Sequence, residues 1–175
     1  MTQSRHAFIS IVFCAVALML PASVWAQTDC DLDPAIVDAV DQMQRSHQEF
    51  SYSGTFLKES SGSRNFIEKS HRAGDERGQL DYVNASETEE PQAVWAPRGP
   101  RMSACELGKL YAFHLERGPK VAGRDSVLLH LRPRDGLRLG YRLALDDASG
   151  LILKSESFSE DGTLLERHEY ASLTV

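Results

Sequence analysis

Apolar residues recur along the chain with two different periods, and the first is helical. After Asp33 and Pro34, a pair typical of a helix start, apolar residues follow at the three-to-four-residue spacing of one helix face. That face is formed by Ile36, Val37, Val40 and Met43, followed by His47 or Phe50. The pattern predicts one amphipathic helix over about residues 33–48.

Beyond this helix the spacing of apolar residues falls to two, as expected for β-strands. Residues 51–58 and 64–72 flank the polar turn at residues 60–63 and predict a hairpin, and residues 79–84 predict a weaker strand. The segment that follows, residues 85–109, carries an acidic run and several prolines. We expect it to be a loop with one short strand, Ala93 to Ala96.

The alternation is clearest toward the C-terminus. Val127, Leu129 and Leu131 alternate with polar residues, and the same pattern continues from Leu137 to Leu145. Two further strands are predicted at residues 151–158 and 164–173. Because the turns carry Asp and Gly and no helical segment intervenes, neighbouring strands are expected to pair antiparallel as a meander.

Together these elements predict an α+β fold, mainly β, with one curved antiparallel sheet and one N-terminal helix. The concave face of the sheet is the expected partner of the helix. A half-barrel covered by one helix tends to leave apolar space between helix and sheet, which suits a hydrophobic ligand. The alternative is that side chains fill this space completely. If a cavity exists, its expected lining is Val127, Leu129, Leu131, Tyr141, Leu143 and Leu145, with Phe56 opposite Val40 and Met43.

Residues 1–26 have the features of a cleavable secretory signal peptide. Arg5 precedes the apolar run from Ala7 to Leu20, and Val24 and Ala26 occupy the −3 and −1 positions of a cleavage site. The run is about 14 residues long, shorter than the roughly 20 that span a bilayer, which disfavours a membrane anchor. The expected product is one soluble domain, residues 27–175.

Removal of the signal peptide would leave two cysteines, Cys30 and Cys105. In an oxidising compartment this even number favours an intramolecular disulfide, which would stabilise the fold by roughly 4 kcal/mol in the chain-entropy model. Two unpaired thiols and a bridge between chains remain open. The absence of a Cys-x-x-Cys motif argues against a redox enzyme.

Composition and charge narrow the classes of function. The chain is 42% hydrophobic and 25% charged, as in one ordinary globular domain. Its formal net charge of −6 gives no general electrostatic reason to bind nucleic acid.

The sequence also lacks the common signatures of catalysis. It contains neither a Gly-x-Ser-x-Gly elbow, nor a His-Glu-x-x-His motif, nor a phosphate-binding glycine loop. The histidines are scattered singly, and the acid pairs Glu89-Glu90 and Asp146-Asp147 are interpreted as solvated surface. We therefore expect no catalytic residue, no metal site and no cofactor, and we predict that the protein is not an enzyme.

Several short blocks, taken in order, resemble the MucB/RseB family of periplasmic regulators of the envelope stress sigma factor sigma-E. Each block alone is weak, but their combined order is specific. Upstream, residues 50–56 and His71-Arg72 resemble the first two strands of the family. The C-terminal blocks are residues 121–124, 132–136, 140–146, 150–156 and 161–166.

The resemblance covers only the N-terminal domain of that family. It implies a fold like that of the lipoprotein carrier LolA, an open antiparallel half-barrel with helices inside and an apolar cavity. Residues 80–110 match poorly, so we expect the cavity-covering helices of the family to be missing there. Relatives continue into a second, smaller domain implicated in gripping the anti-sigma factor, which leaves binding of that partner by this chain open.

The resemblance implies a periplasmic sensor that modulates an RseA/MucA-like anti-sigma factor. Its expected signals are lipid, lipopolysaccharide or the acyl chains of mislocalised lipoprotein. The alternative is a LolA-like carrier of lipid or lipoprotein without a regulatory role. Whether the chain forms a homodimer is left open.

Overall fold

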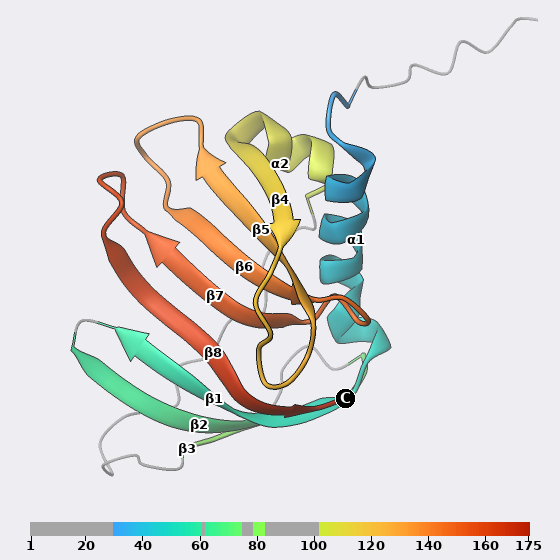
Figure 1. Cartoon of the computed structure of the whole chain (residues 1–175), viewed down its shortest axis with the longest axis vertical. Helices are drawn as coiled ribbons and strands as arrows, with labels where there is room; N and C mark the ends of the chain where they lie inside the picture. Colours follow the sequence, from blue (N-terminus) through green and yellow to red (C-terminus); the bar gives the residue numbers. More distant parts are fainter. Residues whose placement is uncertain (1–29, 61, 75–78, 83–101) are drawn as a thin grey trace, which may run out of the picture.

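The computed structural model describes residues 30–60, 62–74, 79–82 and 102–175 (Figure 1). Two helices and eight strands make up this part of the chain. In chain order they are α1 (Pro34–Glu49), β1 (Tyr52–Ser60), β2 (Ser63–His71), β3 (Gln79–Tyr82), α2 (Ala104–Leu110), β4 (Tyr111–Arg117), β5 (Ser126–Pro133), β6 (Gly140–Asp146), β7 (Ile152–Phe158) and β8 (Leu164–Thr174).

The strands form one antiparallel sheet in the order β3-β2-β1-β8-β7-β6-β5-β4. β4 to β8 follow one another as the predicted meander, and the N-terminal hairpin joins the sheet through pairing of β1 with β8. Figure 1 shows a strongly curved sheet, with α1 and α2 lying beside its β4–β6 half. The predicted fold class, a curved antiparallel sheet with an N-terminal helix, is confirmed.

Helix α1 begins and ends where local chemistry favours it. The Asp33 carboxylate accepts a hydrogen bond from the backbone N–H of Ala35 at 2.9 Å, and Pro34 occupies the first helical position. The helix ends before Phe50, whose backbone is extended. Its buried residues Ile36 and Val40 pack against β5 and β6 to form the main hydrophobic core.

Helix α2 lies where a loop was expected, so that expectation is wrong. The Ser103 hydroxyl accepts a hydrogen bond from the backbone N–H of Glu106 at 3.2 Å, and the Glu106 carboxylate accepts one from the backbone N–H of Ser103 at 2.8 Å. This is a capping box, which satisfies two N–H groups that the first turn would otherwise leave without partners. The absence of the family's cavity-covering helices from residues 80–110 stays a prediction, and the strand expected from Ala93 to Ala96 lies outside the described residues.

Two further expectations need correction. Leu137, expected in a strand, is 91% exposed, and the backbone N–H of this residue donates to the Asp135 carboxylate at 3.1 Å in a turn before β6. Asp146, expected to be solvated, is 2% exposed. It accepts two hydrogen bonds from the Arg124 guanidinium, at 2.7 and 2.8 Å, and one from the Ser149 hydroxyl at 2.6 Å. Glu89 and Glu90 lie outside the described residues.

A disulfide joins Cys30 to Cys105, with their Cα atoms 5.4 Å apart. The intramolecular pairing that the sequence favoured is therefore present, and it ties the segment before α1 to α2. Neither of the helices in the described ranges has the length and apolar character needed to cross a membrane.

Candidate functional site

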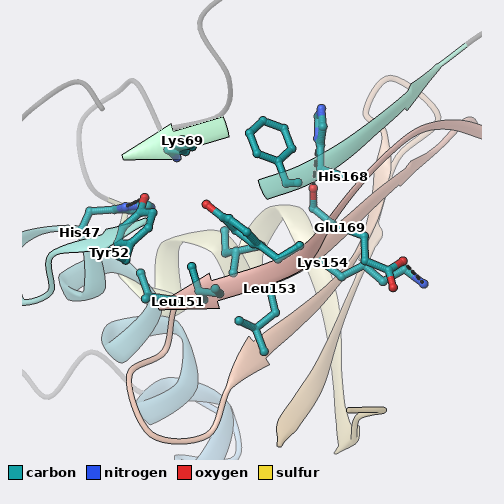
Figure 2. Close-up of a pocket in the computed structure, with 13 residues that line it drawn as sticks. His47, Tyr52, Lys69, Leu151, Leu153, Lys154, His168 and Glu169 are labelled. Atoms are coloured by element: carbon teal, nitrogen blue, oxygen red, sulfur yellow. Dashed lines mark hydrogen bonds and ion pairs between the residues drawn. The ribbon is translucent and has the colours of Figure 1, made fainter. Parts of the chain in front are cut away.

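A pocket lies between the C-terminal end of α1 and the strands β1, β2, β7 and β8 (Figure 2). Its cavity volume is about 50 Å³. Phe56, Leu151, Leu153 and Leu173 supply apolar side chains, and histidine, tyrosine and lysine side chains supply polar ones. The pocket is therefore apolar with a few polar groups, as small-molecule sites usually are, but it is much smaller than the roughly 300 Å³ at the lower end for such sites.

At one side of the pocket, side chains connect the C-terminal end of α1 to the β1–β2 hairpin. His47 is in the last turn of α1, and Tyr52 and His71 are directly opposite each other on β1 and β2. The Tyr52 hydroxyl and Nδ1 of His47 are 2.9 Å apart, and the Nε2–H of His71 donates to the His47 carbonyl oxygen at 2.7 Å. The Tyr52 and His71 rings stack with their centroids 4.9 Å apart.

The electrostatics of this side of the pocket keep the His47 ring neutral. Burial, together with the positive charge of Lys69, lowers the pKa of His47 from 6.5 to about 4. Burial also raises the pKa of Tyr52 well above its usual value, so the phenol stays protonated. Both groups are therefore available at neutral pH as uncharged hydrogen-bonding partners.

Lys69 brings a cationic side chain into the pocket. It lies on β2, two residues before His71, and is only 8% exposed. Its Nζ is 5.3 Å from the centre of the Tyr52 ring, a cation–π arrangement. Among the described residues, no carboxylate lies within 4.0 Å of this ammonium. Burial lowers the pKa of Lys69 to about 8.

The β1–β8 side of the pocket is aromatic. Phe56 and Tyr170 are cross-strand partners, with ring centroids 5.7 Å apart. The His168 and Phe56 rings are T-shaped to each other, with centroids 6.0 Å apart. Nε2 of His168 is buried and has no hydrogen-bond partner among the residues that the structure describes. It is 3.6 Å from a Glu166 carboxylate oxygen, which also lies 3.5 Å from the Lys58 ammonium. Burial is the main cause that lowers the pKa of His168.

Lys154 and Glu169 contribute to the pocket wall, but their charges point elsewhere. Figure 2 shows both side chains directed away from the labelled tyrosine and Lys69. The Lys154 ammonium is 3.7 Å from the Glu169 carboxylate and 3.0 Å from that of Glu156, which in turn is 2.8 Å from Arg142. These outward charges therefore neutralise one another across β6, β7 and β8.

The groups that line the pocket are suited to binding a small molecule. The pocket offers one ammonium, uncharged phenol and imidazole groups, and apolar walls. Across the described ranges, no three His, Cys, Asp or Glu side chains are placed to share a metal ion. Its chemistry suits a small anionic or polar group attached to an apolar one.

The structure separates the residues predicted to line a cavity into two sets. Phe56 lines the pocket. The others pack together in the core under α1, on one face of the sheet, where Val127 lies opposite Leu145, Leu129 opposite Leu143 and Leu131 opposite Tyr141. The core members are Val40, Met43, Val127, Leu129, Leu131, Tyr141, Leu143 and Leu145. A ligand-binding role for these residues stays a prediction.

Sequence reasoning missed most of the polar residues of the pocket. Tyr52, Lys69, His168 and Tyr170 come from β1, β2 and β8, and they meet only because β8 pairs with β1. Strand alternation predicts which of them share a face within one hairpin. It does not predict a pairing between strands that are separated by most of the chain.

Comparison with known proteins identifies relatives of one kind. A family model described as the MucB/RseB N-terminal domain matches residues 83–175. The sigma factor AlgU regulatory protein MucB of Pseudomonas aeruginosa is 29% identical over 160 residues, which are 79% of this chain and 50% of that protein. The sigma-E factor regulatory protein RseB of Haemophilus influenzae is 28% identical over 79 residues, 45% of this chain and 25% of that protein.

Solved structures agree with this comparison. A crystal structure of MucB matches with a TM-score of 0.71 and 27% identity, over 81% of this chain and 59% of that one. The structure of the Pseudomonas aeruginosa MucA/MucB complex matches with a TM-score of 0.66 and 27% identity, over 80% of this chain and 56% of that one. The chain thus spans about half the length of the curated MucB that it matches.

Proposed function

Because the chain belongs to the family described as the MucB/RseB N-terminal domain, we propose that it is a regulatory protein of the sigma-E envelope stress response. The proposed partner is the periplasmic segment of a MucA- or RseA-like anti-sigma factor. The observation that carries the proposal is the similarity to MucB along most of this chain, since MucB itself has been solved in complex with MucA.

The proposed compartment is the periplasm. In this proposal residues 1–26 are a cleaved signal peptide, and residues 27–175 form one soluble domain. The disulfide between Cys30 and Cys105 supports the assignment, because such bonds persist in oxidising compartments.

The proposed signal is lipid, lipopolysaccharide or the acyl chain of a mislocalised lipoprotein. The apolar walls of the pocket support an apolar ligand. The proposal assigns the protein a regulatory role without catalysis, in keeping with relatives that are described as regulatory proteins.

Isothermal titration calorimetry tests the partner. The protein purified after expression of the full 175-residue chain is titrated with the periplasmic segment of the anti-sigma factor of the same organism. Saturable binding with one segment per chain is the expected result, and a segment of the same composition in scrambled order is the control. Heats indistinguishable between the two segments would contradict the proposed function.

The apolar walls of the pocket are also compatible with a second candidate, a carrier of lipid or lipoprotein that has no regulatory partner. A carrier must enclose acyl chains, whereas most of the residues predicted to line such a cavity pack against one another in the core. Native mass spectrometry distinguishes the two candidates. Acyl lipid retained on the purified protein, together with no heat from the anti-sigma segment, would favour the carrier.

A further inference from the structure

We propose that the pocket binds the carboxylate of an apolar-tailed monoanion, with the Lys69 ammonium as its counter-charge. The inference deepens the sensing part of the proposed function, on which it rests, by naming the ligand class and the residue that recognises it.

Among the described residues, the charges around the cavity include one positive charge without a carboxylate partner. Lys69 is 8% exposed, and among the described residues no carboxylate lies within 4.0 Å of its Nζ. The nearby Lys58 and Glu166 are 3.5 Å apart and neutralise each other, and Lys154 and Glu169 face away from the aromatic rings. A buried ammonium without a counter-charge is costly, so one bound anion would offset that cost.

The histidines and tyrosines that line the cavity add no second charge at neutral pH. His47 from α1 and His168 from β8 have lowered pKa values, chiefly through burial, and both rings are neutral. Tyr52 from β1 and Tyr170 from β8 have raised pKa values through burial and stay protonated. The cavity therefore matches a monoanion better than a dianion such as a phosphate monoester.

The size and the apolar walls of the cavity limit the tail that is attached to the carboxylate of the ligand. A volume of about 50 Å³ holds a carboxylate with its first methylene groups, and the rest of a longer chain would extend beyond the cavity. Phe56, Leu151 and Leu153 form apolar walls next to Lys69, where the first methylene groups would be removed from water. Water is the competing occupant of a cavity of this size.

Protonation of Lys69 gives the proposal a pH signature. The pKa of Lys69 in the free protein is about 8, so the ammonium is mostly charged at pH 7. A bound carboxylate favours the charged form, and by linkage its affinity is expected to fall toward tenfold per pH unit above pH 8. The carboxylate of the ligand stays ionised throughout this range.

The test uses hexanoate and its uncharged analogue hexanol as probes of the full chain, followed by backbone amide chemical shifts in NMR titrations. We expect hexanoate to shift the amides around Lys69 and to bind at least tenfold more tightly than hexanol. The variant Lys69→Met is expected to weaken hexanoate binding at least tenfold and to leave hexanol binding unchanged. It should fold, because it replaces a buried ammonium by an apolar side chain of similar length, and its thermal unfolding is recorded to establish that.

Lys154→Met is the matched control. It removes an ammonium from the same pocket wall, but one that points outward to Glu156 and Glu169. Hexanoate binding is expected to stay within twofold of that of the unmodified chain. Equal losses in the two variants, or equal affinities for hexanoate and hexanol, would overturn the inference.

Two further titrations distinguish a carboxylate ligand from a phosphate ligand, and hexanoate binding from binding of the anti-sigma segment. Hexyl phosphate that binds more tightly than hexanoate at pH 8 would contradict the choice of a monoanion. Both lysine variants are also titrated with the anti-sigma segment. If the chain binds the anti-sigma segment but not hexanoate, this inference is overturned and the proposed regulatory function stands. If it binds hexanoate but not the segment, only the proposed regulatory function is contradicted.

Discussion

At the residue scale, the polar side chains around the pocket are held by partners from other elements. The neutral His47 ring at the end of α1 meets the Tyr52 hydroxyl at 2.9 Å, and its carbonyl accepts the hydrogen bond of His71. Asp146 is held in a similar way by Arg124 and Ser149. The sequence presents each of these residues singly, so neither the cluster nor the burial of Asp146 could be predicted before the strand pairing was known.

His47 is expected to make the protein sensitive to acid. Its pKa is about 4 in the folded protein and 6.5 without the fold, so between these values the unfolded state binds a proton that the folded state excludes. The free energy of unfolding should therefore fall as the pH is lowered from 6.5 to 4, by at most about 1.4 kcal/mol per pH unit from this group. His47→Gln should flatten that decline in urea titrations at several pH values.

His114→Gln provides the control for this prediction, because the His114 side chain is 69% exposed. It should leave the acid dependence of the unfolding free energy as it is in the unmodified chain. An equally steep decline in the His47 variant would show that other groups govern the acid sensitivity.

Asp146→Asn tests the buried ion pair. The pKa of Asp146 is lowered although burial alone would raise it, because hydrogen bonds from Arg124 and Ser149 favour the carboxylate. Removing its charge leaves Arg124 without a counter-charge, and we expect a loss of about 1–3 kcal/mol in the free energy of unfolding. Asp147→Asn, at the exposed neighbouring position, should cost under about 0.5 kcal/mol. Similar losses in the two variants would contradict the structural role of Asp146.

At the element scale, strand pairing is what creates the pocket. Alternation of apolar residues predicted the first hairpin and the C-terminal meander, because both are local patterns of period two. Pairing of β1 with β8 was not predictable, since strands far apart in the sequence carry no local signal for each other. Helix α2 did have such a signal, Ser103 followed by Glu106 at the capping-box spacing, and the neighbouring prolines obscured it.

Gly54→Ala tests the β1–β8 contact. Gly54 on β1 is directly opposite Leu173 on β8, and a Cβ at this position would overlap the carbonyl oxygen of Ser172. The two strands would have to move apart, at an expected cost of about 1–3 kcal/mol in the free energy of unfolding. Gly140→Ala is the control, because the nearest atom to its Cβ would be 3.5 Å away, in ordinary contact. Equal stability of the two variants in thermal unfolding would count against the close approach of β1 to β8.

At the scale of the whole molecule, the fold joins a packed half and a half that carries a pocket. The core under α1 fills the β5–β6 region, and the pocket lies at the end of α1, next to β1 and β8. The family resemblance gave the fold class correctly, and a ligand-binding role for the residues that pack under the helix stays a prediction. Because that core and the pocket share α1, a ligand in the pocket could alter how the end of the helix is held.

We propose that the protein binds an anti-sigma factor and responds to an envelope lipid. Calorimetric titration of the full chain with the periplasmic segment of that factor, repeated at increasing concentrations of lipopolysaccharide, tests both parts of this proposal. We expect saturable binding whose dissociation constant rises at least tenfold with lipopolysaccharide, since two ligands that favour different states weaken each other's binding reciprocally. Segment binding that lipopolysaccharide leaves unchanged, or no binding of the segment at all, would contradict it.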